Sequence, residues 1–135
     1  MKETLRMRPP AWAMGRQAIN NCLLGKQEIK ADDVVIMSQW VMHHDARFYD
    51  TPLQFQPERW LLNPKQALPR YAYFPFGGGN RICIGEHFAI TEAIAVLAMI
   101  ARKWKVMPIN KDMSTPKPSV TLRPRAGVKV LIEKR

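Results

Sequence analysis

The sequence predicts a mainly α-helical fold with small β-sheets, which places it in the α+β class. One long helix is expected from about Gly85 to Arg102, where Ile90, Ile94 and Leu97 recur at spacings of four and three residues. Shorter runs of β-branched and apolar residues, bounded by turn residues, predict short strands forming hairpins. Eleven prolines against seven glycines in 135 residues indicate that most of the chain is divided into short pieces.

The other elements can be placed in chain order. A short helix is expected over Lys2–Met7, ended by Pro9 and Pro10. A second short helix is expected over residues 38–43, with Ser38 as its N-cap. A proline-rich meander is predicted for residues 45–70. Strands are predicted over residues 19–24, 34–37, 105–109, 120–123 and 127–132, the last two paired through a turn at 124–127.

The long helix is apolar nearly all round, and such helices lie at the centre of larger proteins. A chain of 135 residues amounts to one domain at most and supplies few elements to cover it. We therefore expect residues 1–135 to be part of a larger domain in which this helix is buried.

Composition and charge exclude several classes of protein. The longest apolar run, Ala93–Ala101, has nine residues, whereas a helix crossing a bilayer needs about 20. Two cysteines are too few for a disulfide-rich scaffold, and the opening residues do not form a signal peptide. The net charge is +10, and residues 102–135 hold ten basic and two acidic side chains. Such a tail could contact nucleic acid, an anionic membrane surface or an acidic protein, or form a solvated surface.

Cys83 stands between a glycine-rich loop at residues 77–80 and the start of the long helix. Backbone N–H groups at a helix N-terminus favour a preceding thiolate. The glycines allow the backbone to approach a flat, bulky group, and Arg81 offers a guanidinium to a carboxylate on that group. A flat, carboxylate-bearing ligand whose iron takes a cysteine thiolate is haem. The alternative is that Cys83 is a buried apolar residue beside an ordinary turn.

Other uses of a glycine loop fit less well. A phosphate-binding loop needs Lys-Ser or Lys-Thr after its last glycine, but Gly85 is followed by Glu86. A dinucleotide-binding motif starting at Gly77 would need glycine at Ile82. The two cysteines and three histidines also lack the spacing of a zinc site.

Three motifs resemble those of the cytochrome P450 family. Residues 76–85, FGGGNRICIG, match its haem-binding signature F-x-x-G-x-R-x-C-x-G. Residues 3–6, ETLR, resemble its E-x-x-R motif, and residues 55–60, FQPERW, resemble its F-x-P-E-R-W segment. All three follow the family's order, and the resemblance covers essentially the whole chain. It implies the fold of the C-terminal, haem-binding portion of a cytochrome P450.

The resemblance implies a role for each matching residue. Cys83 would be the axial thiolate on the iron of haem b, and so both the metal ligand and the catalytic residue. Glu3, Arg6 and Arg59 would form a buried structural network. The other cofactor-binding residues would be Phe76 beside the thiolate, Gly77, Gly79 and Gly85 along the loop, and Arg81 and Arg16 on the haem propionates. In the family's H-R-D segment, His44 replaces the arginine.

The function implied is that of a haem-thiolate monooxygenase, which inserts one oxygen of O2 into an apolar organic substrate. Its electrons would come from a ferredoxin or a flavoprotein reductase, steered by basic residues such as Arg102, Lys103 and Lys105. Nothing in the chain corresponds to the family's oxygen-activating helix or to most of its substrate-contacting loops. We therefore expect a fragment of a longer, cytoplasmic enzyme with weak or no activity alone, and a preceding membrane anchor is left open.

Two other functions are considered. One is a non-catalytic basic protein, or a remnant, that binds nucleic acid through residues 102–135. This tail lacks the interleaved aromatic residues of a single-strand binder and contains no helix-turn-helix pattern, so no nucleic acid partner is expected. The other is a peroxygenase that uses the same haem site.

Overall fold

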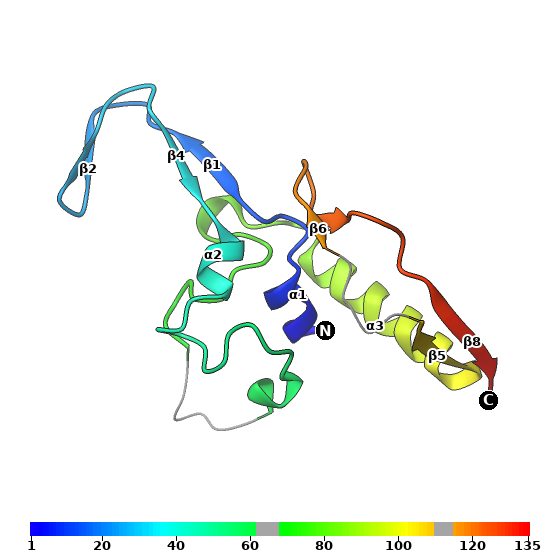
Figure 1. The fold of residues 1–135 in the computed structure, drawn as a ribbon. Coiled ribbons are helices and arrows are strands. Elements are labelled where there is room, and N and C mark those ends of the chain that lie inside the picture. The colour runs from blue at the N-terminus through cyan, green and yellow to red at the C-terminus, as the bar shows by residue number, and fades with distance from the viewer. Residues whose placement is uncertain (62–67, 110–114) are drawn as a thin grey trace.

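The computed structural model describes residues 1–61, 68–109 and 115–135. Pro64 of the predicted meander, and Lys111 and Asp112 of the basic tail, lie outside the described residues. The molecule is elongated, with a central body from which a hairpin projects on one side and a helical arm on the other (Figure 1).

The first 43 residues form two short helices and two hairpins. In chain order these elements are α1 (Lys2–Met7), β1 (Met14–Gln17), β2 (Cys22–Leu24), β3 (Gln27–Ile29), β4 (Val34–Met37) and α2 (Gln39–His43). Strand β1 pairs antiparallel with β4, and β2 with β3, so that β2 and β3 extend the projecting hairpin. Helix α1 packs against α2 in the central body.

The rest of the chain contains the long helix and two further strand pairs. Its elements are the 3-10 helices η1 (Pro57–Trp60) and η3 (Gly79–Arg81), helix α3 (Glu86–Lys103), and strands β5 (Trp104–Pro108), β6 (Pro116–Lys117), β7 (Arg123–Pro124) and β8 (Val130–Lys134). Strand β5 pairs antiparallel with β8, and β6 with β7. Helix α3, β5 and β8 together make the arm in Figure 1.

The predicted α+β class is confirmed, since the structure holds a few helices and small antiparallel sheets. The predicted pairing of residues 120–123 with 127–132 is wrong. Strand β8 instead pairs with β5, where Val106 lies opposite Ile132 and Met107 opposite Leu131. Such apolar cross-strand pairs stabilise a ladder. Strand β7 contains Pro124, which cannot donate a ladder hydrogen bond, and its partner is the short β6.

The closely packed part of the molecule is small and unusually polar. Among the described residues, the buried apolar side chains are Met7, Pro9, Tyr49, Ala72 and Pro75. Buried polar side chains accompany them, namely Glu3, Arg6, Gln39 and His43. The Tyr49 hydroxyl donates a hydrogen bond of 2.9 Å to the carbonyl of Ala72. Because α1, α2 and the meander meet here, this polar centre fixes the positions of all three.

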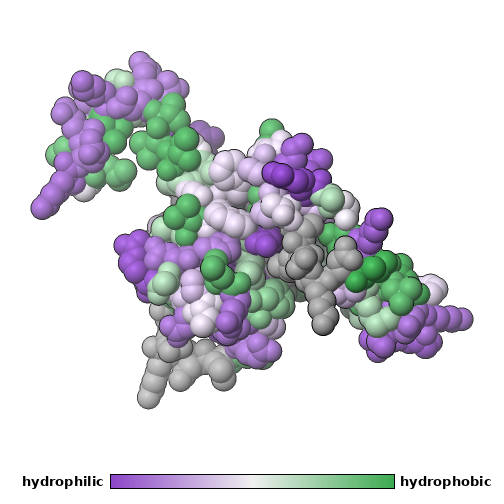
Figure 2. Space-filling view, viewed as in Figure 1, coloured by the Kyte–Doolittle hydropathy of each residue, from purple (hydrophilic) through white to green (hydrophobic). Residues whose placement is uncertain are grey.

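Helix α3 lies where it was predicted; its burial was predicted within a larger domain, and in this chain the helix is exposed. None of its residues is buried, and Phe88, Leu97 and Met99 are 72%, 55% and 71% exposed. Figure 2 shows apolar surface over the arm formed by α3 and β5. The described elements cover only part of the helix, as the sequence led us to expect. Within the described ranges, no helix has the length and apolar character needed to cross a membrane.

Ser38 joins α2 to the first hairpin. Its hydroxyl accepts a hydrogen bond from the Val41 N–H at 3.3 Å, which caps the helix as predicted, and donates one to the Trp12 carbonyl at 3.0 Å. The Trp40 N–H donates to the same carbonyl at 3.1 Å. The start of α2 is therefore held against the segment that leads into β1.

We expect Ser38→Ala to lower the free energy of unfolding by about 1 kcal/mol, because the cap is lost. Urea unfolding followed by circular dichroism measures this change. Ser119→Ala removes the hydroxyl of an exposed serine and is the control, expected to lie within about 0.5 kcal/mol of wild type. Equal effects of the two substitutions would contradict a capping role for Ser38.

Candidate functional site

The loop before α3 folds back on itself. The Cys83 N–H donates to the Phe76 carbonyl at 2.9 Å, and the Gly77 N–H donates to the Phe74 carbonyl at 2.9 Å. Gly77 has φ of +79°, a left-handed conformation that glycine adopts without steric cost. A β-carbon on Gly77 would also lie 3.3 Å from the Met14 Cε. The loop therefore places Cys83 beside Phe76 and in front of α3, and this path requires a glycine.

A pocket of about 380 Å³ opens beside Cys83. Three segments distant in sequence line it: α1 with Leu5, β1 with Arg16, and the start of α3 with Ile90. The loop itself contributes Phe76, Gly77, Arg81 and Cys83. Most of the lining surface is apolar. Five of the seven residues that the sequence assigns to cofactor binding are thus brought together.

The remaining two, Gly79 and Gly85, do not line this pocket. Gly79 lines a neighbouring apolar pocket of about 670 Å³, which Arg16 also borders. Gly85 lies behind the thiol, where a β-carbon would be 3.7 Å from the Cys83 Sγ. Gly85 is also the N-cap residue of α3, and the Glu86 N–H donates to the Cys83 carbonyl at 3.4 Å rather than to its sulfur.

The chemistry of the lining residues fits a haem. Cys83 is a free, exposed cysteine that borders the pocket, so its sulfur is accessible to an iron. Arg16 and Arg81 bring two guanidinium groups to the same pocket, which suits carboxylates on the ligand. The apolar remainder suits a macrocycle. Within the described residues, no group of three or more His, Cys, Asp or Glu side chains is placed to hold a metal ion.

Glu3, Arg6 and Arg59 meet in the central body. Arg6 donates two hydrogen bonds to the Glu3 carboxylate, at 2.8 and 2.9 Å, and the Arg59 Nε donates to Glu3 at 3.2 Å. The exposed fractions of Glu3 and Arg6 are 1% and 0%. The Gln56 N–H and the Trp60 Nε1–H also donate to this carboxylate, at 2.9 and 2.8 Å. Glu3 therefore joins α1 to the meander through three donor groups, those of Gln56, Arg59 and Trp60.

These bonds determine the charge state of Glu3. Burial by itself raises the pKa of the carboxyl group, but hydrogen bonds from Arg6, the Gln56 N–H and Trp60 outweigh it and lower the pKa to about 2. His43, by contrast, is held in its neutral form. Burial lowers the pKa of its ring to about 4, so the ring is uncharged at pH 7. The Phe74 N–H donates to the His43 Nε2 at 3.0 Å, which places the ring proton on Nδ1.

Sequence reasoning assigned no role to two residues that the structure connects with these groups. Trp60, which is half-buried, donates to Glu3, and the signal was its place at the end of the P-E-R-W segment. Gln39 is fully buried and borders the Cys83 pocket, and its position directly after Ser38 gave no indication of this.

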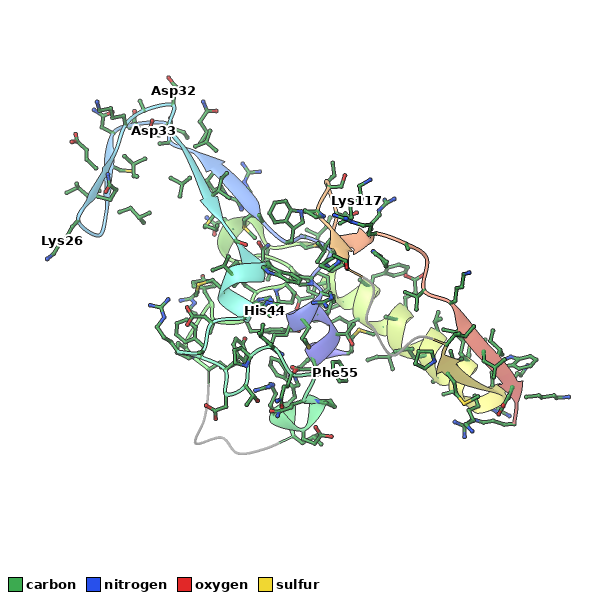
Figure 3. All side chains as sticks on the ribbon, in the orientation of Figure 1. Lys26, Asp32, Asp33, His44, Phe55 and Lys117 are labelled. Carbon is green, nitrogen blue, oxygen red and sulfur yellow. The ribbon has the colours of Figure 1, made fainter. Side chains whose placement is uncertain are left out.

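His44, which replaces the arginine of the family's H-R-D segment, forms no ion pair with Asp45. Its ring lies against Trp40, with Nδ1 2.7 Å from the Trp40 carbonyl, and Asp45 instead pairs with Arg47 at 2.6 Å. Figure 3 shows His44 beside α2, in the central body.

The sequence of this chain is similar to those of known proteins. The sequence model of the family "Cytochrome P450" matches residues 1–132. Cyclooctatin synthase of Streptomyces melanosporofaciens is 38% identical over 89% of this chain and 26% of its own length. Probable cytochrome P450 4d20 of Drosophila melanogaster is 32% identical over 100% of this chain and 26% of its own. Cyclooctat-9-en-7-ol 5-monooxygenase of S. melanosporofaciens is 35% identical over 79% of this chain and 23% of its own length. The chain spans about a quarter of the length of these curated relatives.

We expect Glu3→Gln to lower the free energy of unfolding at pH 7 by about 3–5 kcal/mol, because Arg6 is left buried without a counter-charge. The depressed pKa makes the carboxylate's contribution fully present above about pH 4.5, and lost as the pH falls toward 2. The difference between wild type and variant should therefore shrink over that range. Urea unfolding at several pH values measures it.

Glu28→Gln, on strand β3, removes an exposed carboxylate and is the matched control. A pH-independent difference for Glu3→Gln would contradict this account of the network.

Proposed function

Because this chain belongs to the cytochrome P450 family, we propose that it forms the thiolate side of the haem site of a monooxygenase, with Cys83 as the iron ligand. One observation carries this assignment: the free thiol of Cys83 borders an apolar pocket into which two arginines also reach. Residues 1–135 then make up the C-terminal, haem-binding part of the domain.

Each side chain at the pocket has a task in this proposal. When haem b is bound, its iron supplies the chemistry of O2 activation, which no amino-acid side chain offers. Cys83 holds the iron and donates electron density to it. Arg16 and Arg81 pair with the haem carboxylates and set the orientation of the ring. Phe76 and Ile90 exclude water from the Cys83 sulfur. Gly77 has no side chain, so the backbone of the loop can lie close to the haem.

The reaction proposed for the complete protein is insertion of one O2 oxygen into an apolar organic substrate. The second oxygen leaves as water, which requires two electrons and two protons from outside the site. A ferredoxin or a flavoprotein reductase would supply the electrons. The monooxygenase named among the relatives supports this class of reaction, although the chain covers only 23% of that protein.

We expect the purified chain to bind hemin and, after reduction and addition of CO, to show a strongly red-shifted Soret band. Cys83→Ala should abolish that band, because the thiolate donor is removed. Absorbance titration followed by CO difference spectroscopy measures both properties.

Cys22→Ala is a matched control, since Cys22 is the other free, exposed cysteine and lies on β2 in the projecting hairpin. A spectrum indifferent to Cys83, or equally sensitive to Cys22, would rule out the proposed ligand.

We further expect that charge reversal at the end of α3 slows reduction of the haem-loaded chain by an acidic electron donor. Arg102→Glu with Lys103→Glu should lower the rate about tenfold at low ionic strength and flatten its dependence on salt. Lys105 is left unchanged, because its Nζ lies 3.8 Å from the Glu133 Oε2 and reversing its charge would also break this ion pair. Stopped-flow reduction with an acidic ferredoxin measures the rate.

Lys26→Glu with Lys30→Glu makes the same change of charge on the projecting hairpin, where Figure 3 places Lys26 at the tip, and is the control. If both double variants reduce at equal rates, the end of α3 is not the docking surface.

A further inference from the structure

The side-chain amide of Gln39 is buried without a hydrogen-bond partner among the described residues. Gln39 is the first residue of α2, its exposed fraction is 0%, and it borders the Cys83 pocket. Neither its Oε1 nor its Nε2 has a hydrogen-bond partner among the described residues. Leaving a buried amide unbonded is unfavourable, so a partner is expected from outside this set of side chains.

His43 can supply a hydrogen-bond partner for one of these two atoms, the Gln39 Oε1. It lies one helical turn after Gln39 and is also fully buried, and its Nδ1, which carries the ring proton, likewise lacks a partner. Residues four apart lie on the same face of a helix. A small rotation of the Gln39 side chain can therefore satisfy Oε1 with the His43 Nδ1–H. That arrangement leaves the Gln39 Nε2, a donor, without an acceptor.

Among the described residues, no carboxylate side chain lines the pocket to accept a hydrogen bond from this donor. Arg16 and Arg81 are the charged side chains among the described residues that line it, and no Asp or Glu does so. Two cations and one amide donor thus border the same apolar space. An acceptor that comes with the ligand would satisfy Gln39, and the two cations favour an anionic acceptor.

We propose that Gln39 is a further cofactor-binding residue, whose Nε2 donates a hydrogen bond to a haem carboxylate that Arg16 or Arg81 also pairs with. This inference rests on the proposed function, because it takes haem as the ligand. It adds to the two arginines a neutral donor held by α2, and thereby connects the orientation of the haem to the buried polar centre of the fold.

The test compares hemin with its dimethyl ester, in which both carboxylates are neutralised. Gln39→Leu should weaken hemin binding by about 10- to 100-fold, the usual loss for a hydrogen bond to a charged group. The same substitution should change the affinity for the dimethyl ester by less than about threefold. Gln39→Glu replaces the donor by a second anion and should weaken hemin binding more than Gln39→Leu. Gln27→Leu, on β3, is the control.

The outcomes separate the inference from the proposed function. If wild type binds hemin through Cys83 but Gln39→Leu binds it equally well, Gln39 makes no contact and only the inference fails. An equal loss with hemin and with the dimethyl ester also overturns it, because packing rather than a carboxylate is then responsible. If wild type does not bind hemin, the proposed function fails for this chain, and the Gln39 contact fails with it.

Discussion

The guanidinium of Arg6 is the interaction on which the arrangement of the molecule depends. It is completely buried, and all five of its N–H groups donate hydrogen bonds, a complete use of the side chain's donors. Two go to Glu3 on its own helix, and the others go to the backbone carbonyls of His43, Pro52 and Gln54. One side chain thus holds α1, the end of α2 and the meander together. Arginine is suited to this position because its charge is not lost by deprotonation on burial.

The pocket of Cys83 is connected to this arginine through backbone bonds. The carbonyl of His43 accepts from Arg6, while the His43 ring accepts from the Phe74 N–H just before the glycine loop. At the other end of α2, Ser38 donates to the Trp12 carbonyl, next to the strand that carries Arg16. Loop and strand are therefore positioned by the same short helix. This connection links the network of Glu3, Arg6 and Arg59 to the site without a contact with Cys83.

What the sequence could predict was local. The cap at Ser38, the helix ended by Pro9 and the glycine loop before Cys83 each follow from neighbouring residues, and the structure has them in place. Pairings between distant segments were not predictable in this way. Strand β1 lacks β-branched residues and was missed, although its register with β4 brings Arg16 to the pocket. The role of Gln39 depends on which segments surround α2, and no pattern in the sequence records that.

The exposed apolar surface of α3 explains why polar contacts dominate in this chain. A helix with Phe88 and Leu97 more than half exposed contributes little hydrophobic stabilisation to the 135 residues. Few apolar side chains are buried elsewhere, so the order of the central body rests on hydrogen bonds and ion pairs, chiefly those that join Glu3, Arg6 and Arg59. Such a centre is geometrically specific, because an unpaired buried charge is strongly unfavourable. The position of Cys83 can therefore be defined by the polar centre, whereas burial of α3 requires surface that the described residues do not provide.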